Sequence, residues 1–191
     1  MGKLVVTEFV TLDGVMQDPG GAEKETFPRG GWAFRFERGE EGDRFKFDEL
    51  MAADAQLLGR TTYEGFAKAW PAMEGTGDFG KKFNEMPKFV VSTTLENPEW
   101  NNTTVLTGDL AEEVGKLKER FSGDILVAGS ATLVQSLLAR DLVDQLDLMI
   151  FPVLLGTGKR LFADAADMTA FSLVEARQTG SVAILTLRKG S

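Results

Sequence analysis

The sequence predicts an α/β fold in which helices cover both faces of a mostly parallel sheet and an antiparallel hairpin forms one edge. Runs of apolar and β-branched residues alternate with helix-like segments along most of the chain, which is typical of a parallel sheet. Two last strand-like segments, residues 171–179 and 182–188, flank Gly180-Ser181, a spacing that predicts a hairpin. With 191 residues, 43% of them hydrophobic, the chain suits one domain, residues 1–191, with a sizeable core.

The individual elements follow from local patterns. The first strand, residues 3–12, precedes a glycine-rich loop over residues 13–39, and a loop of that length is expected to be functional. Asp109 and Glu112 have the spacing of a capping box, which predicts the start of a helix. The remaining predicted strands are residues 55–58, 88–92, 103–107, 124–128 and 144–153; the remaining helices are residues 43–53, 61–69, a short one through Phe83, and 130–139.

The composition excludes several classes of function. The chain has no Cys and no His, so disulfides, thiolate nucleophiles, zinc sites and any triad with a His base are excluded, and no metal site is expected. A net charge of −8 argues against nucleic acid or an anionic membrane as the main partner. The longest apolar run, residues 148–155, is far too short to span a membrane, and the N-terminal segment lacks the features of a signal peptide. A cytoplasmic location is therefore expected.

Two turns that lead from a predicted strand into a predicted helix have the features of an anion site. In residues 57–62, Arg60 adds a positive charge after Gly59, and residues 126–132 break at Gly129. The N–H groups at a helix N-terminus are free, the helix dipole favours negative charge there, and glycine lets a phosphate approach the backbone. Two such turns predict a ligand with two phosphate groups, such as a dinucleotide. The alternative is that both glycines only end strands.

The glycine-rich turn at residues 156–160 fits neither of two familiar nucleotide-binding motifs. A Walker A loop requires Ser or Thr after its Lys, where this chain has Arg160. A Rossmann fingerprint requires Gly where this chain has Leu161. A nucleotide site in this chain therefore belongs to another fold.

A set of short segments, each weakly specific alone, occurs in one order along nearly the whole chain. They are residues 11–14 (TLDG), 58–64 (LGRTTYE), 87–95 (PKFVVSTTL), 128–130 (AGS), 142–144 (LVD) and 152–162 (PVLLGTGKRLF). Together they resemble the dihydrofolate reductase-like superfamily, and within it the reductase domain of riboflavin biosynthesis and its stand-alone bacterial relatives. This resemblance implies a three-layer α/β/α sandwich with a mostly parallel sheet and an antiparallel C-terminal hairpin.

The resemblance also implies NADPH as the cofactor. Arg60 would lie near the 2′-phosphate; the alternative is an ordinary surface arginine. By resemblance, the adenosine-side phosphates and their pocket would involve Gly59, Arg60, Thr61, Thr62, Ser92 and Thr93, and the pyrophosphate would involve Gly129, Ser130, Ala131 and Thr132.

The substrate side leaves alternatives open. Asp13 resembles the acidic residue beside the nicotinamide in riboflavin-type reductases, but an Asp before Gly is also a common turn former. Asp43 lies 16 residues before Gly59, the spacing of the substrate-binding carboxylate in bacterial dihydrofolate reductases, but it also suits the first turn of a helix. Trp32 is interpreted either as stacking on a heterocycle or as packing under the loop. The glycine-rich turn offers Gly156, Gly158, Lys159 and Arg160 for a substrate phosphate, or these cations only pair with surface acids.

The resemblance implies hydride transfer to a C=N or C=O carbon of a small polar heterocycle, as in 5-amino-6-(5-phosphoribosylamino)uracil reductase. Folate is not expected as the substrate, because no Arg or Lys lies between Thr93 and Val105, where folate enzymes clamp the glutamate. The alternatives are a reductase of this fold that acts on an unrelated compound, and a non-catalytic nucleotide-binding protein. A homodimer is expected, with residues 146–153 and the hairpin as interface candidates.

Overall fold

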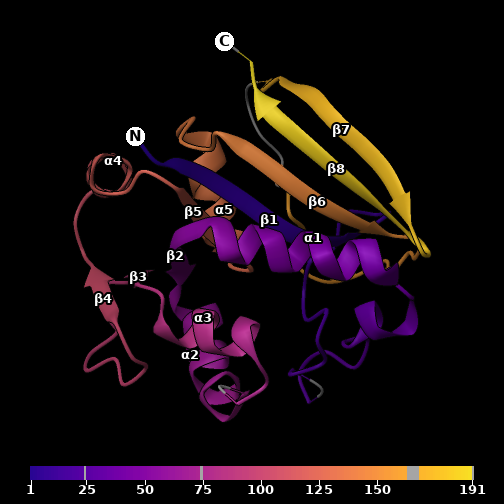
Figure 1. The fold of residues 1–191 in the computed structure, drawn as a ribbon, viewed down its shortest axis with the longest axis horizontal. Coiled ribbons are helices and arrows are strands. Elements are labelled where there is room, and N and C mark those ends of the chain that lie inside the picture. The colour runs from indigo at the N-terminus through magenta and orange to yellow at the C-terminus, as the bar shows by residue number, and fades with distance from the viewer. Residues whose placement is uncertain (24, 74, 163–167, 191) are drawn as a thin grey trace.

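The computed structural model describes residues 1–23, 25–73, 75–162 and 168–190, which contain an eight-stranded sheet in the order β4-β3-β2-β5-β1-β6-β8-β7 (Figure 1). The strands are β1 (Lys3–Thr11), β2 (Ala53–Gly59), β3 (Lys88–Val91), β4 (Thr103–Leu106), β5 (Asp124–Ala128), β6 (Gln145–Phe151), β7 (Phe171–Thr179) and β8 (Val182–Lys189). The helices are α1 (Gly39–Ala52), α2 (Arg60–Ala69), α3 (Asp78–Glu85), α4 (Leu110–Arg120) and α5 (Ala131–Ala139), with the 3-10 turns η1 (Trp32–Arg35) and η2 (Pro71–Met73).

The pairing of the strands changes from parallel to antiparallel at one side of the sheet. From β4 to β6 every neighbouring pair is parallel, whereas β8 pairs antiparallel with both β6 and β7. The two-residue turn Gly180-Ser181 joins β7 to β8, as the sequence predicts. Parallel neighbours require long crossovers, and helices supply them here. The predicted fold class is therefore confirmed.

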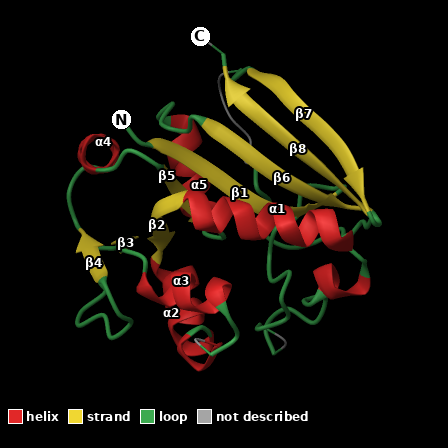
Figure 2. Ribbon diagram, viewed as in Figure 1, coloured by secondary structure: helices red, strands yellow, loops and turns green. Residues whose placement is uncertain are grey.

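Helices cover the two faces of the parallel part (Figure 2). On one face, α1, α2 and α3 pack against β1 through a cluster that includes Val5 and Leu50. On the other face, α4 and α5 pack through a cluster that includes Leu4, Val6 and Val134. Successive residues of β1 thus point into two different cores, because a parallel strand with helices on both sides is buried on both faces.

Helix α1 begins at Gly39, four residues before the start predicted from the sequence. Its first turn is held by the end of β7: the Thr179 hydroxyl donates to the Arg38 carbonyl over 2.6 Å and accepts from the Gly42 N–H over 3.1 Å. A contact between residues so distant in sequence leaves no local sequence pattern that could predict it. The tertiary fold therefore decides where α1 begins.

None of the helices in the described part of the chain is long and apolar enough to cross a membrane.

Candidate cofactor and substrate site

The carboxyl ends of β1 and β5 form a topological switch point. After β1 the chain crosses one face through α1 to β2, and after β5 it crosses the opposite face through α5 to β6 (Figure 1). The two strands pair only as far as Thr7 and Ala128, while β1 continues along β6 to Thr11. In open α/β sheets ligands bind in the crevice at such a point. This edge of the sheet is therefore the candidate site.

Two strand-to-helix turns meet at this edge. The Gly59 N–H donates to the Ser130 hydroxyl over 2.8 Å, which links the end of β2 to the start of α5. Gly129 has φ +69°, and a Cβ there would lie 2.8 Å from Thr62 Cγ2. Only glycine allows both this backbone conformation and this close approach. The glycine turns singled out in the sequence thus form one unit.

No side chain caps the N-terminus of α2 or of α5. Ser130 occupies the N-cap position of α5 but directs its hydroxyl to Gly59. The first-turn N–H groups of the two helices therefore remain available to an anion. In contrast, Asp109 caps α4 and accepts from the N–H groups of Ala111 and Glu112 over 2.9 and 3.1 Å.

Arg60, on the first turn of α2, extends toward the loop after β3. Its guanidinium donates to Thr94 over 2.6 Å and to Glu64 over 2.7 Å, and about half of its side chain is exposed. Ser92 shapes this loop, since its hydroxyl accepts from the N–H groups of Thr94 and Leu95. The fold thus brings the residues expected to bind the cofactor to one edge, where Thr61, Thr93 and Thr132 are exposed.

Asp13 lies at the end of β1 and holds the turn after β6. Its carboxylate accepts from the Gly156 N–H over 2.7 Å, the Leu155 N–H over 3.2 Å and the Thr11 hydroxyl over 2.6 Å. Burial alone would raise the pKa of Asp13, but these hydrogen bonds prevail and lower its pKa to about 2. At neutral pH the carboxylate is therefore ionised. Its geometry suits an orienting role.

The glycine-rich turn lies next to Asp13. The Arg160 side chain donates to the Asp13 carbonyl, and residues 15 and 160 form an isolated antiparallel bridge. The Lys159 N–H donates to the Gln17 side chain over 3.0 Å. Lys159 and Arg160 are both exposed, so the fold presents two cations close to the end of β1.

Asp43, a candidate substrate-binding carboxylate by its spacing from Gly59, lies on the surface of α1. Asp43 is exposed just after the first turn of α1 and pairs with Arg38 over 2.7 Å. Lys46 and Glu49 face the sheet instead: the Lys46 ammonium donates to the Thr7 hydroxyl and to the Glu49 carboxylate. Asp43 therefore lies on the exposed side of α1, whereas Lys46 and Glu49 lie on the side that faces the sheet.

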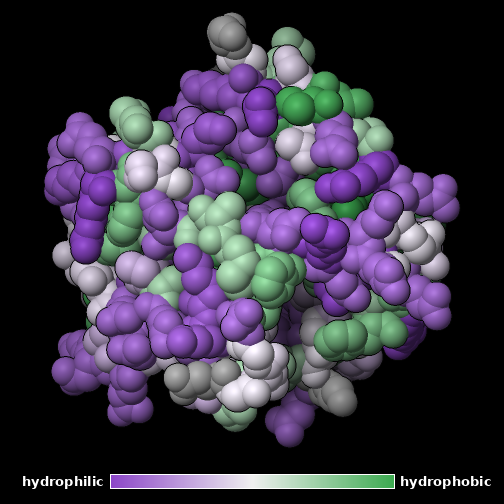
Figure 3. All heavy atoms as spheres, viewed as in Figure 1, coloured by the Kyte–Doolittle hydropathy of each residue, from purple (hydrophilic) through white to green (hydrophobic). Residues whose placement is uncertain are grey.

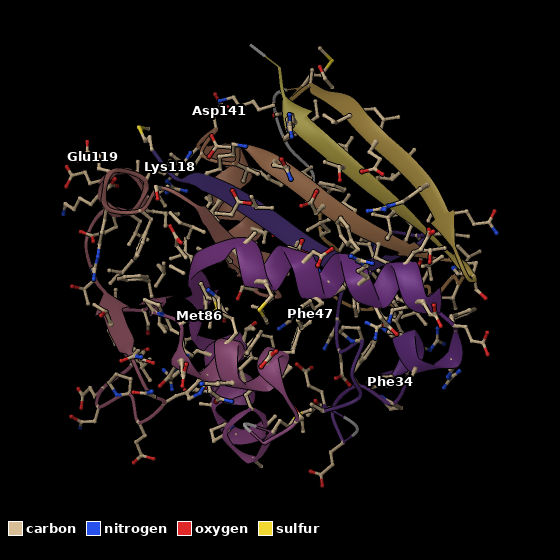
Figure 4. The ribbon with its side chains drawn as sticks, in the orientation of Figure 1. Phe34, Phe47, Met86, Lys118, Glu119 and Asp141 are labelled. Atoms are coloured by element: carbon tan, nitrogen blue, oxygen red, sulfur yellow. The ribbon has the colours of Figure 1, made fainter. Side chains whose placement is uncertain are left out.

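Trp32 packs in the core and does not face a ligand. It is 1% exposed, its indole N–H donates to the Gln17 carbonyl over 2.8 Å, and its ring meets Phe151 edge-on at 5.2 Å. The exposed ring on η1 is that of Phe34, which points away from the body of the protein (Figure 4). Of the two interpretations of Trp32, the structure supports packing.

Sequence reasoning missed three polar residues near β1: Glu8, which is buried, and Lys46 and Glu49, which are half-buried. Glu8 is 6% exposed within a strand buried on both faces, and burial raises its pKa well above the usual value. Burial likewise raises the pKa of Glu49. A signal for Glu8 did exist, because an acidic residue inside an otherwise apolar parallel strand is unusual.

Two hollows lie away from this edge. One, of about 590 Å³, lies between α2 and the loop before β4 and includes Tyr63 and Trp100. The other, of about 450 Å³, lies between α1 and β7 and includes Glu49, Asp147 and Arg177. The candidate site is therefore assigned from its topology and its uncapped helices.

The fold defines the class of protein: an α/β protein whose parallel strands end at one edge of the sheet, next to this crevice. The chain belongs to the RibD C-terminal domain family, whose model matches residues 2–185. Solved structures that share its fold include RibD of Acinetobacter baumannii and a dihydrofolate reductase.

Individual relatives agree with this assignment. The uncharacterized protein YyaP of Bacillus subtilis is 28% identical over 182 residues, which cover 94% of this chain and 90% of YyaP. A protein of Shewanella sp. PV-4 named for riboflavin biosynthesis superposes with a TM-score of 0.78 at 19% identity over 99% of both chains. Dihydrofolate reductase of Enterococcus faecalis, complexed with NADP(H), superposes with a TM-score of 0.57 at 15% identity over 100% of this chain and 98% of that one. These two structures show the shared fold.

Proposed function

We propose that the protein is an NADPH-dependent reductase that acts on a small polar heterocycle. The observation that carries this proposal is the pair of uncapped helix N-termini, α2 and α5, which the hydrogen bond between Gly59 and Ser130 joins at the switch point. Two adjacent anion sites suit the phosphates of a dinucleotide. Family membership and the NADP(H) complex of the Enterococcus dihydrofolate reductase support the choice of cofactor.

The residues at the edge fit the cofactor in chemical terms. Arg60 supplies a fork of donors for a 2′-phosphate and lies over the loop shaped by Ser92. At Gly129 the backbone before α5 packs directly against the Thr62 side chain on the first turn of α2. In this proposal Thr61, Ser130, Ala131 and Thr132 contribute the remaining N–H and hydroxyl donors to the phosphates, and Thr93 borders the adenosine. Gly59, whose N–H is held by Ser130, lets a phosphate approach the backbone.

The cofactor would supply a hydride to a C=N or C=O carbon of the substrate, while the nitrogen or oxygen of that bond takes a proton. Asp13 is ionised at neutral pH and has no proton to give, so the proton comes from water at the open edge. Asp13 instead holds the turn that carries Gly156, Gly158, Lys159 and Arg160. We assign this turn to the substrate, with the two cations available to a phosphate group.

The substrate that this proposal favours is the one that the family resemblance implies, 5-amino-6-(5-phosphoribosylamino)uracil. Membership of the RibD C-terminal domain family supports this choice. Folate lacks such support, because no Lys or Arg lies between Thr93 and Val105 to hold its glutamate.

Turnover by the purified protein tests the proposal. NADPH absorbance is followed with a panel that contains 5-amino-6-(5-phosphoribosylamino)uracil, related heterocycles and dihydrofolate. We expect NADPH oxidation with a heterocycle and little or none with dihydrofolate. Efficient reduction of dihydrofolate would contradict the choice of substrate. Binding of NADPH without turnover across the panel would indicate a non-catalytic binding protein, and no binding would refute the proposal.

We also propose that the protein forms a homodimer through its C-terminal hairpin. β7 is the edge strand of the sheet, and its Leu173 and Val174 are about half exposed or more. Figure 3 shows apolar side chains gathered over β7. Symmetric pairing is a common way to cover such an edge. Light scattering should give twice the chain mass of 20.9 kDa, and a value near 20.9 kDa would contradict the dimer.

A further inference from the structure

Glu8 lies where β1 and β5 separate. The last paired residues of these strands are Thr7 and Ala128, so Glu8 is the first residue of β1 beyond the ladder, beside Gly129. Val6 and Val10, the residues on the same face of β1, belong to the core that α5 covers. The Glu8 side chain therefore points to the α5 side of the crevice, where β5 has turned into the helix.

The Glu8 carboxyl group is buried and only partly satisfied. Glu8 is 6% exposed, and its Oε1 atom has no hydrogen-bond partner among the described residues. Burial raises the pKa of Glu8 well above its usual value, while the Gly129 N–H and Lys46 lower it and Glu49 raises it further. Burial thus favours the neutral form of this carboxyl, which has one O–H donor and one carbonyl acceptor.

An unpaired carboxyl in an apolar core destabilises a fold, and an apolar side chain of similar shape removes that cost. The neighbours of Glu8 on β1 and α5 are apolar, so packing does not require an acid at this position. A costly polar group beside a ligand crevice is a sign of function.

The order of the strands places Glu8 at one end of the proposed cofactor site. Arg60 and Thr94 lie over β2 and β3, and the uncapped helix ends lie over β2 and β5, so Glu8 on β1 comes next. The distance from β3 to β1 is three strand spacings, about 14 Å. A dinucleotide with its 2′-phosphate at Arg60 and its pyrophosphate at the helix ends directs its nicotinamide toward β1. The primary carboxamide of that ring carries N–H donors and an acceptor oxygen, and one of these donors would complement the unpartnered Oε1 atom of Glu8.

We propose that Glu8 is a positioning residue that hydrogen-bonds the nicotinamide carboxamide of the cofactor at the gap between β1 and β5. The proposal rests on the NADPH-dependent function proposed above. It assigns a ligand contact to a side chain on the opposite face of β1 from Lys46 and α1.

Two variants and three ligands test this role. Glu8→Met keeps the length of the side chain and removes its polar atoms, whereas Glu8→Gln keeps a donor and an acceptor. Binding is measured for NADPH, for its 3-acetylpyridine analogue, which lacks the amide N–H, and for 2′-phospho-ADP-ribose, which lacks the nicotinamide. Thermal unfolding of each variant is measured in parallel.

We expect Glu8→Met to bind NADPH about tenfold more weakly, a loss that corresponds to one hydrogen bond. It should bind 2′-phospho-ADP-ribose like the wild type and unfold at an equal or higher temperature. Glu8→Gln should stay within about threefold of the wild type for NADPH. The wild type should prefer NADPH to the acetylpyridine analogue by about tenfold, and Glu8→Met should lose that preference.

Other outcomes overturn the proposal. If Glu8→Met binds NADPH like the wild type, or if the wild type does not distinguish the acetylpyridine analogue, Glu8 does not contact the carboxamide. If Glu8→Met loses both NADPH and 2′-phospho-ADP-ribose and unfolds at a lower temperature, Glu8 has a structural role only. If the wild type binds neither ligand, the proposed NADPH-dependent function itself fails.

Discussion

The ends of β2 and β5 and the end of β1 lie at the same edge of the sheet but use their backbone N–H groups in opposite ways. At β2 and β5 the helices that follow have no side-chain cap, and the Ser130 hydroxyl joins the two turns. At β1 the Asp13 carboxylate occupies the N–H groups of Leu155 and Gly156. The first region leaves donors for a ligand, and the second uses its donors to shape a turn. We therefore assign the phosphates of the proposed cofactor to the uncapped helices and not to the surroundings of Asp13.

The largest effect is expected from Gly129→Ala, which breaks the uncapped region. A Cβ at this position would lie 2.8 Å from Thr62 and would have φ +69°. Strain of this kind costs about 1–3 kcal/mol, and the turn must also move, so NADPH binding should weaken by roughly 100-fold in a fluorescence titration. Gly115→Ala in α4 is the matched control, because a Cβ there meets open space and φ is not positive. Equal affinities for the Gly129 variant and the wild type would refute the assigned site.

Asp13→Asn breaks the other region. The variant loses the charge that holds the N–H groups of Leu155 and Gly156, so the substrate turn shifts, and a misplacement of about 1 Å costs roughly 10²-fold in turnover. NADPH affinity should stay within a few-fold, because the proposed phosphate sites lie over β2 and β5. Steady-state kinetics with a substrate that the protein reduces measures both the turnover and the dependence on NADPH. Full activity of Asp13→Asn together with an inactive Asp43→Asn would show that Asp43 is the functional acid.

Asp13→Asn should also change how the free energy of unfolding depends on pH. The pKa of Asp13 is about 2 in the folded protein, below the value of about 3.9 of an unfolded chain. Its stabilisation is therefore complete above about pH 4 and is lost as the pH falls toward 2. Asp13→Asn should lose about 1 kcal/mol at pH 7, a small value because solvent screens this partly exposed group, and should lack this part of the acid dependence. Denaturant unfolding at several pH values measures it.

Arg60→Ala tests a single side chain at the uncapped N-terminus of α2. Charge-assisted hydrogen bonds to a 2′-phosphate are worth roughly 1.5–3 kcal/mol, so NADPH affinity should fall about tenfold or more while NADH affinity stays nearly unchanged. Arg44→Ala, on the exposed side of α1, removes the same charge away from the site and serves as control. Equal losses for NADPH and NADH would place Arg60 elsewhere relative to the cofactor.

The smallest effect is expected from Asp109→Ala, which uncaps a helix outside the site. The Asp109 carboxylate accepts from Ala111 and Glu112, and loss of a cap costs about 1 kcal/mol, or roughly 2–4 °C in unfolding temperature. NADPH affinity should not change, since α4 lies after the edge strand β4. A change in affinity as large as that of Arg60→Ala would extend the binding region to β4.

Much of the fold was predictable because its signals are local. Strand β5 has the predicted bounds, the Asp109 cap begins α4, and the turn Gly180-Ser181 forms the hairpin. Each of these depends on residues a few positions apart. Less of the substrate side could be predicted from the sequence. Trp32 packs against Phe151, which lies far away along the chain, and no residue near Trp32 in the sequence indicates this contact.

By itself, the sequence determined the order of strands and helices and the two glycine turns, because alternation of apolar residues and the backbone freedom of glycine act over a few residues. Only the tertiary structure decided what these pieces do together. Gly59 meets Ser130 across 71 positions, and Asp13 meets Gly156 across 143. The burial of Glu8 follows from strand pairing that ends at Thr7 and Ala128. Such long-range contacts depend on the whole set of packing interactions, so a local pattern does not encode them.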